Sequence, residues 1–271
     1  MKRYFQIHIA TKSSEEAECL IAELSAINFY AFEQENNWLN AYITEPDFDE
    51  QKLKGILPAG ASYREKIIEE ENWNEKWEKT IEPIIVNDFV AIRPSFSKPT
   101  NKVKFDLIIT PKMSFGTGHH PTTFLMVEIM ESIDFHDKSV IDFGTGTGVL
   151  AILAEKCGAP KVTAIDFDDW SIQNASENIE VNGCRIIEIR QQSNLSGIDL
   201  ADIVLANINL NVLRDNSVRL KSLIKKGGLL LLSGFLGSDE AQMVSIFQEK
   251  NLVKIKSRQR GEWLAMLFKN V

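Results

Sequence analysis

The stretch SVIDFGTGTGVLAILAEKCG, residues 139–158, decides the fold. Its apolar start predicts a short strand that ends at Phe143, and a glycine-rich turn follows. Residues 149–156 then have a helical pattern, which Gly158 can end in the left-handed conformation. A glycine-rich turn between a strand and a helix lets a ligand approach the backbone, and the helix N-terminus offers free N–H groups. The stretch therefore predicts a strand, a ligand-binding turn and a helix.

The next predicted strand ends in an acidic residue. The strand predicted at residues 161–166 ends at Asp166, 22 residues after Gly144. A carboxylate at this position can accept hydrogen bonds from both hydroxyls of a ribose. A dinucleotide fingerprint, GxGxxG, would need glycine at Val149, and no Gly-Lys-Ser/Thr sequence follows for a phosphate-binding loop. The spacing GxGxG before an acidic strand end is typical of S-adenosylmethionine-dependent methyltransferases. The alternatives are a nicotinamide or flavin cofactor, or glycines with a structural role alone.

Strands and helices alternate from Val86 onward. Further short strands are predicted at residues 186–190, 202–206 and 229–233. The tail differs, because the predicted strands 252–257 and 263–268 are too close in the sequence for a crossover helix and can only pair antiparallel. We therefore predict an α/β fold: a seven-stranded Rossmann-like sheet of the class I methyltransferase type that ends in a C-terminal antiparallel hairpin.

Residues 1–57 predict a small, separate α+β domain of the ferredoxin-like type. Ser13 and Glu16 have capping-box spacing before an amphipathic helix. Half-buried strands are predicted around this helix at residues 5–10, 29–32 and 38–43. A strand, a helix and two strands in about 55 residues fit an α+β arrangement.

Residues 58–85 are predicted to link this domain to a methyltransferase domain at residues 86–271. The linker contains an acidic run and then Trp73 and Trp77, which share one face of a predicted helix because they are four residues apart. These tryptophans can pack on a neighbouring domain or belong to a core. Pro83 marks a plausible end of the linker.

The charge of the chain is unevenly distributed. The 271 residues carry a net charge of −8; residues 1–85 contain 17 acidic and 9 basic side chains, and residues 86–271 contain 21 of each. A general nucleic-acid binder would need an excess of lysine and arginine to contact phosphates, so we expect no direct nucleic-acid substrate. The acidic first third either promotes solubility or forms a docking surface for a basic partner.

Cysteine and histidine usage gives no indication of a metal site. The three cysteines, Cys19, Cys157 and Cys184, are widely spaced, which fits a reducing compartment and argues against a disulfide framework. The N-terminus lacks the apolar core of a signal peptide, and no apolar run approaches the length of a membrane span. The sequence therefore predicts a cytoplasmic protein that binds neither a membrane nor a metal.

Two more segments carry candidate site residues. Residues 115–123, FGTGHHPTT, form a glycine-rich loop before an apolar helix, in which Pro121 suits the first turn. Asn207 ends a predicted strand at the sheet edge where such folds bind ligands, and its amide carbonyl could accept a hydrogen bond from a substrate amine. Asn209 could equally cap the next helix.

These blocks resemble the bacterial ribosomal protein L11 methyltransferase family, and the resemblance runs over most of the chain. It implies that S-adenosylmethionine is the cofactor and that Asn207 orients the acceptor amine. It also implies that the N-terminal domain of a monomeric enzyme recognises the basic ribosomal protein L11, whose lysine side chains or N-terminal amine are methylated. The residues that the resemblance places at the cofactor or beside it are Phe115, Thr117, Thr123, Gly144, Gly146, Asp166 and Asn207.

The sequence also departs from the family pattern. The family usually has threonine at His119 and Cys-x-Ser at residues 145–147, and its motif after Asn207 differs from the sequence found here. Residues 191–194, QQSN, offer no carboxylate for an adenine amine. The competing functions are a methyltransferase of another protein or of a small molecule, and a non-catalytic nucleoside-binding regulator.

Overall fold

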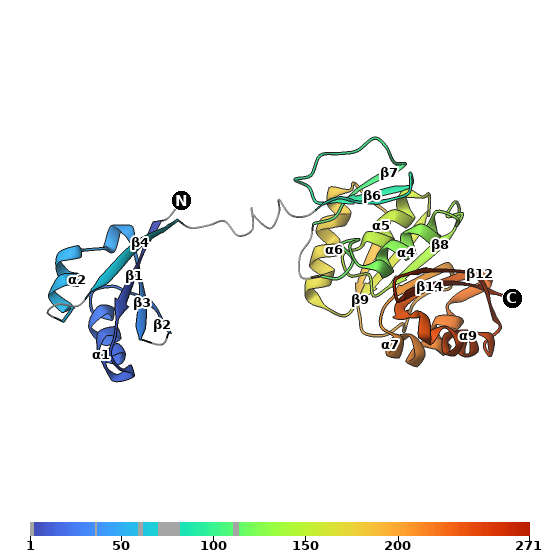
Figure 1. The fold of residues 1–271 in the computed structure, drawn as a ribbon. Helices are drawn as coiled ribbons and strands as arrows, with labels where there is room; N and C mark the ends of the chain where they lie inside the picture. The colour runs from blue at the N-terminus through green and yellow to red at the C-terminus, as the bar shows by residue number, and fades with distance from the viewer. Residues whose placement is uncertain (1–2, 36, 59–61, 70–81, 111–113) are drawn as a thin grey trace. The chain divides into compact units, whose positions relative to one another are not determined.

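The computed structural model describes residues 3–35, 37–58, 62–69, 82–110 and 114–271 (Figure 1). The chain divides into two compact units, Met1–Glu78 and Lys79–Val271. No helix among the described residues is long and apolar enough to cross a membrane.

The N-terminal unit is a four-stranded antiparallel sheet with the strand order β2-β3-β1-β4. This order defines the ferredoxin-like fold and confirms the expected type of domain. The elements are β1 (Arg3–Ala10), α1 (Ser14–Ser25), β2 (Ala31–Glu35), β3 (Trp38–Thr44), the 3-10 turn η1 (Glu45–Asp47), α2 (Glu50–Ile56) and β4 (Tyr63–Glu69).

Both helices of this unit pack on the same face of the sheet. Leu20 and Leu24 of α1 and Leu53 of α2 are buried against strand residues such as Ile7 and Leu39. The Ser13 side chain accepts a hydrogen bond from the Glu16 backbone and caps α1, as its sequence position predicts. The alternation of apolar and polar residues therefore sets which face is covered.

The fourth strand corrects the expected linker. The linker was expected at residues 58–85, but Tyr63–Glu69 pairs antiparallel with β1 over its whole length, so the sheet of this unit extends beyond residue 57. The alternating charges of this strand suit an exposed edge, and pairing with a strand some sixty residues away is not visible in a local pattern. Trp73 and Trp77 lie outside the described residues.

The larger unit contains a seven-stranded sheet in the order β10-β9-β8-β11-β12-β14-β13. The first five strands are parallel, and β14 enters antiparallel between β12 and β13. This confirms the predicted sheet and its terminal hairpin. The strands are β8 (Ser139–Phe143), β9 (Lys161–Asp166), β10 (Ile187–Gln191), β11 (Ala201–Asn207), β12 (Ile224–Leu236), β13 (Leu252–Arg260) and β14 (Trp263–Asn270).

Helices cover both faces of this sheet (Figure 1). The neighbouring residues Val140 and Ile141 of β8 point to opposite faces of the sheet and belong to two separate buried clusters, as expected for a sheet buried on both sides. One face packs α4 (Pro121–Met130), α5 (Val149–Lys156) and α6 (Asp169–Val181). The other packs α7 (Leu210–Asp215), α8 (Ser217–Ser222) and α9 (Glu240–Gln248), which follows the 3-10 turn η2 (Gly237–Asp239).

A small three-stranded sheet precedes α4 and was not predicted. It consists of β5 (Ile84–Val86), β6 (Val90–Arg93) and β7 (Phe105–Ile108) in that order. Arg93 is buried and donates to both carboxylate oxygens of Asp106 at 2.9–3.0 Å, which gives it the partner that a buried guanidinium requires. Val90, Ile92 and Leu107 join the same buried cluster as α4 and α5.

Candidate functional site

A pocket of about 630 Å³ lies at the carboxyl ends of β8, β9 and β11. This is the edge at which open α/β sheets bind ligands. The residues that line this pocket include Phe115, His120, Gly144, Gly146, Asp166, Phe167, Asn207, Ile208 and Trp263.

The glycine-rich turn after β8 brings its backbone against two neighbouring segments. Gly146 has φ +54°, and a Cβ there would lie 2.3 Å from the Phe115 carbonyl oxygen. Gly144 has φ +77°, and its Cβ would lie 2.3 Å from Cγ2 of Ile208. Neither contact leaves room for a side chain, so both positions require glycine. The turn therefore presents bare backbone to the pocket.

Asp166 ends β9 with a carboxylate in a fixed orientation. Its Oδ2 accepts from Gly146 N at 2.9 Å, and its Oδ1 accepts from Phe167 N at 2.9 Å and Asp168 N at 3.2 Å. A carboxylate has about four acceptor sites, so these three bonds leave capacity for a ligand hydroxyl. The side chain is only 8% exposed, and that exposed part lines the pocket.

A second carboxylate is buried beneath the turn. Asp142 of β8 is fully buried; its Oδ2 accepts from Thr145 Oγ1 at 2.6 Å, and its Oδ1 has no hydrogen-bond partner among the described residues. Burial raises the pKa of Asp142 from 3.8 to about 7; the Thr145 hydrogen bond opposes this shift and the charge of Asp166 adds to it.

Asn207 presents an unused hydrogen-bond acceptor at the pocket. Its Nδ2 donates to Thr123 Oγ1 of α4 at 3.3 Å, and its Oδ1 is buried without a partner among the described residues. Buried polar atoms are nearly always paired, so an orphaned acceptor on a pocket wall marks a place for a ligand donor. Asn209 instead caps α7 by accepting from Val212 N at 3.1 Å, so the helix-capping alternative holds for Asn209.

Aromatic rings form the wall at the start of α4. The ring centroid of His120 lies 4.6 Å from that of Trp263 and 5.1 Å from that of Phe115. His120 caps α4, because its Nδ1 accepts from Thr122 N at 3.3 Å. Burial lowers the pKa of His120. Since an N–H group can only donate, Nδ1 of His120 is unprotonated, and in the neutral ring Nε2 carries the hydrogen.

The structure brings five of the seven predicted site residues to one pocket: Phe115, Gly144, Gly146, Asp166 and Asn207. Thr123 is fully buried behind Asn207, and Thr117 contacts His119 through its hydroxyl at 3.3 Å from Nδ1, outside the lining. Sequence reasoning missed Trp263 because it opens β14, more than a hundred residues after the glycine-rich turn. It assigned no role to His120, although Pro121 was expected in the first turn of the helix that His120 caps.

The described residues contain no group of three or more histidine, cysteine or acidic side chains that could hold a metal ion. Burial raises the pKa of Cys157 and of Cys184 to about 11, so both thiols are protonated at neutral pH and neither is an activated nucleophile.

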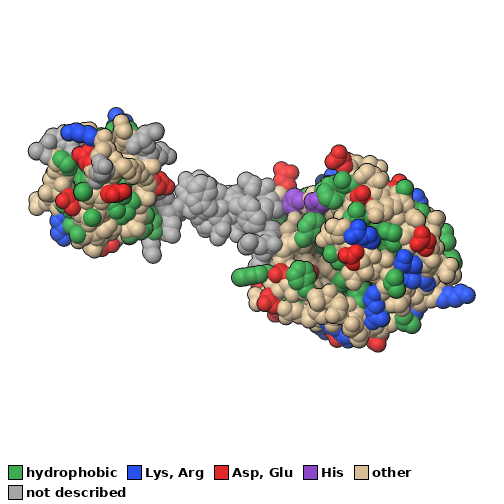
Figure 2. Space-filling view, turned by 90° about the horizontal axis from the view of Figure 1, so that it is seen from below, with side chains coloured by type: hydrophobic (Ala, Val, Ile, Leu, Met, Phe, Trp, Pro, Cys, Tyr) green, Lys and Arg blue, Asp and Glu red, His purple; other side chains and the backbone are tan. Residues whose placement is uncertain are grey.

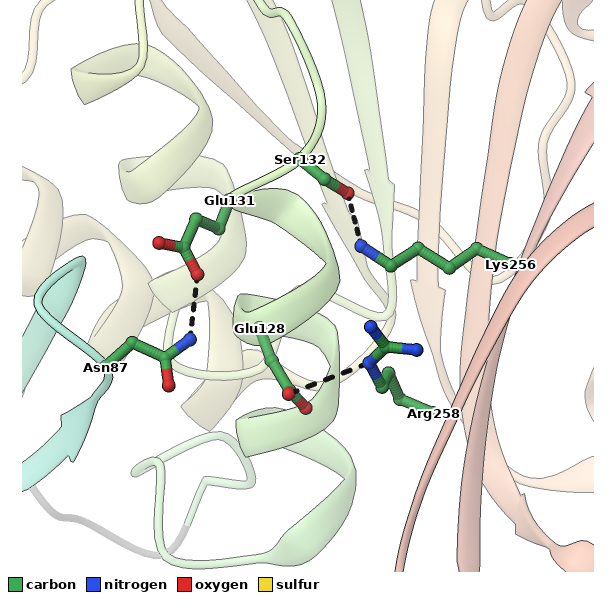
Figure 3. Close-up of a pocket in the computed structure, with 6 residues that line it drawn as sticks. All are labelled: Asn87, Glu128, Glu131, Ser132, Lys256 and Arg258. Atoms are coloured by element: carbon green, nitrogen blue, oxygen red, sulfur yellow. Dashed lines mark hydrogen bonds and ion pairs between the residues drawn. The ribbon is translucent and has the colours of Figure 1, made fainter.

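A smaller pocket of about 200 Å³ lies between α4 and the edge strand β13 (Figure 3). Its polar groups bind one another: Asn87 donates to Glu131 at 2.8 Å, Lys256 donates to Ser132 at 2.8 Å, and Arg258 lies 3.8 Å from Glu128. Because these groups already have partners and none is a predicted site residue, we interpret this pocket as a polar packing interface between α4 and β13.

The strand order, the antiparallel insertion of β14 and the glycine-lined pocket define a class I methyltransferase. The structure is similar to a crystal structure of ribosomal protein L11 methylase from Lactobacillus delbrueckii subsp. bulgaricus, with a TM-score of 0.65 and 28% sequence identity over 70% of this chain and 99% of that chain.

Sequence comparison identifies the family. The model for "Ribosomal protein L11 methyltransferase (PrmA)" matches residues 4–271. Two relatives with the name ribosomal protein L11 methyltransferase are similar over nearly their whole lengths. The one from Porphyromonas gingivalis is 40% identical over 260 residues, 93% of this chain and 90% of that protein. The one from Bacteroides fragilis is 34% identical over 277 residues, 98% of this chain and 99% of that protein. The chain belongs to the ribosomal protein L11 methyltransferase family, and the resemblance drawn from its motifs is confirmed.

Proposed function

We propose that this methyltransferase transfers methyl groups from S-adenosylmethionine to amino groups of ribosomal protein L11. The observation that carries the proposal is the buried, unpaired Oδ1 of Asn207 on the wall of a glycine-lined pocket. It offers an acceptor to an N–H donor, and an amine is such a donor.

The pocket fits the cofactor in three respects. The glycine-rich turn offers bare backbone at Gly144 and Gly146. The Asp166 carboxylate keeps acceptor capacity for ribose hydroxyls, and a volume of about 630 Å³ lies in the range of pockets that hold molecules of this size. The nicotinamide and flavin alternatives are not favoured, because Val149 replaces the third glycine of their fingerprint.

When bound, S-adenosylmethionine supplies a methyl group already activated by a sulfonium centre. The residues of the chain then have to position a neutral amine in line with that group. Asn207 Oδ1 would accept one amine hydrogen, and its own Nδ2 is held by Thr123. A lysine amine has a pKa of about 10.4 in water, and the rings of Phe115, His120 and Trp263 reduce its hydration, which favours the neutral form.

The proton leaves the amine before transfer, and His120, which lines the pocket among the described residues, is not available as the base. His120 cannot accept this proton at Nδ1, because that atom already accepts from the Thr122 backbone. Its Nε2 carries the hydrogen of the neutral ring and is a donor. We therefore infer that the ammonium loses its proton to water as it enters the pocket.

The N-terminal unit is proposed to select the protein substrate. Residues 1–85 hold 17 acidic against 9 basic side chains, which suits a basic ribosomal protein. The sheet face opposite the helices carries His8 stacked on Trp38 at 4.2 Å, and Tyr42, which donates to Glu33 at 2.7 Å. Figure 2 shows acidic and hydrophobic side chains interspersed on the visible surface of this unit. Aromatic rings beside carboxylates are suited to lysine and arginine side chains.

The test combines the purified protein with S-adenosylmethionine and unmethylated ribosomal protein L11, followed by intact and peptide mass measurement. Methyl increments on amine-bearing peptides support the proposal. Asn207→Ala should lower turnover more than cofactor affinity, and an equal loss of both would reject its role at the amine. Cofactor binding without methylation of L11 would move the function to another protein, a small molecule or a non-catalytic regulator.

A further inference from the structure

Two asparagines, Asn178 of α6 and the C-cap residue Asn182 that follows this helix, bind backbone groups of other segments. Asn178 and Asn182 are four residues apart and therefore lie one above the other on the helix. Each side-chain amide accepts from one backbone N–H and donates to one backbone carbonyl of another segment. Within the helix, Asn182 Nδ2 also donates to Asn178 O at 2.7 Å, and Asn178 Nδ2 donates to Asn174 Oδ1 at 3.3 Å. Such a pair of contacts fixes which way each amide points, since a backbone N–H can only donate and a carbonyl can only accept.

The two amides hold different parts of the structure. Outside the helix, the Asn182 side chain contacts one residue of β7: its Oδ1 accepts from Ile108 N at 3.0 Å and its Nδ2 donates to Ile108 O at 2.6 Å. Asn178 joins two segments, because its Oδ1 accepts from Thr110 N at 3.0 Å and its Nδ2 donates to Thr147 O at 2.9 Å. Asn178 therefore ties the end of β7 to the glycine-rich turn.

Thr147 continues this connection to the pocket wall. Its backbone N–H donates to Phe115 O at 2.9 Å, and its hydroxyl donates to Gly116 O at 2.7 Å. Both Thr147 and Asn178 are fully buried, and neither lines the pocket. A continuous set of buried hydrogen bonds thus runs from Asn178 through Thr147 to Phe115, whose ring is part of the pocket.

We propose that Asn178 is a positioning residue for the cofactor site. Its amide holds the backbone of Thr147, which in turn bonds to Phe115 and Gly116, and it thereby sets the affinity for S-adenosylmethionine without touching the ligand. This inference rests on the proposed function for the identity of the ligand. Asn182 provides the matched comparison, because it makes the same kind of two-point contact from the same helix but does not reach the turn.

The experiment measures Asn178→Ala and Asn182→Ala in the full chain by thermal unfolding and by calorimetric titration with S-adenosylmethionine. Both variants should lose stability. Asn178→Ala should raise the dissociation constant about 10- to 100-fold, as loss of a positioning contact does, and Asn182→Ala should leave it within about 2-fold. Equal changes in both dissociation constants, or none in Asn178→Ala, would overturn the inference.

Hydrogen–deuterium exchange of the ligand-free protein provides a second readout. The Thr147 amide should exchange faster in Asn178→Ala and at the wild-type rate in Asn182→Ala. If Asn178→Ala does not fold, Asn178→Asp takes its place, because it keeps the acceptor for Thr110 and loses the donor for Thr147. A wild-type protein that does not bind S-adenosylmethionine would reject the proposed cofactor, whereas unchanged exchange in both variants would reject the positioning role.

Discussion

The buried carboxyl of Asp142 should make the larger unit less stable as pH rises. Its folded pKa is about 7 against 3.8 for the free group. Below pH 3.8 the carboxyl is protonated in both states and costs nothing. Between pH 4 and 7 the unfolded chain releases this proton while the folded chain retains it, so stability falls. At about 1.4 kcal/mol per pH unit, the loss approaches about 4 kcal/mol by pH 7.

Asp142→Asn removes this titration and keeps the shape of the side chain. Relative to wild type, the unfolding free energy of the variant should rise by about 2.5 kcal/mol from pH 5 to pH 8. The amide still accepts the Thr145 hydroxyl, although its NH₂ group faces the position where Oδ1 has no partner among the described residues. The unpaired NH₂ group lowers the unfolding free energy of the variant by about 1–3 kcal/mol at every pH, so it does not change how that free energy depends on pH.

The assay is urea unfolding of the full chain at pH 5, 6, 7 and 8, read by hydrogen exchange in peptides from β8 and β11. Asp202→Asn is the control. Burial of Asp202 is outweighed by hydrogen bonds from Lys225 and Ser139, which lower its pKa to about 2. The stabilising effect of the Asp202 carboxylate is complete above pH 3.8 and is lost as pH falls toward 2. The difference in unfolding free energy between Asp202→Asn and wild type should therefore be constant from pH 5 to 8. A constant difference for Asp142→Asn as well would refute the reasoning.

Three further outcomes are expected. Asp166→Ala should weaken the binding of S-adenosylmethionine by about 1.5–3 kcal/mol, measured calorimetrically, because the ribose hydroxyls lose a charged acceptor; an unchanged dissociation constant would remove Asp166 from the site. Gly146→Ala should abolish cofactor binding, because its Cβ would lie 2.3 Å from Phe115 O. Gly197→Ala, with φ +69° and nothing within 4 Å, should cost only about 1 kcal/mol in thermal unfolding. The fragment of residues 79–271 should bind the cofactor and fail to methylate L11, and retained methylation would contradict substrate selection by the N-terminal unit.

The sequence predicts the parts of the fold whose causes are local. The glycine-rich turn and Asp166 each follow a strand at a fixed spacing. Residues 139–166 are therefore enough to predict a ligand-binding site at the carboxyl edge of the sheet. The hairpin of β13 and β14 is predicted because its strands are too close for any other connection. The cap of α1 at Ser13 also depends only on its immediate neighbours.

Features that depend on distant pairing were not predictable in this way. The strand Tyr63–Glu69 is mostly polar and precedes an acidic run, so its local pattern favours a helix, whereas pairing with β1 makes it a strand. Trp263 reaches the pocket only because β14 lies beside β12. The pKa of Asp142 is raised because its side chain is completely buried. This burial cannot be predicted from the residue type and its sequence neighbours.

The position of β14 also determines when the protein becomes active during its own synthesis. The ribosome makes β12 and β13 first, yet in the sheet they are separated by β14, which is made after both. Until residue 263 and those after it emerge, β12 has an unpaired edge and the pocket lacks the ring of Trp263. An unpaired strand edge favours aggregation, so the nascent chain is exposed to this risk until β14 is in place, and the pocket is completed only with the last strand of the sheet.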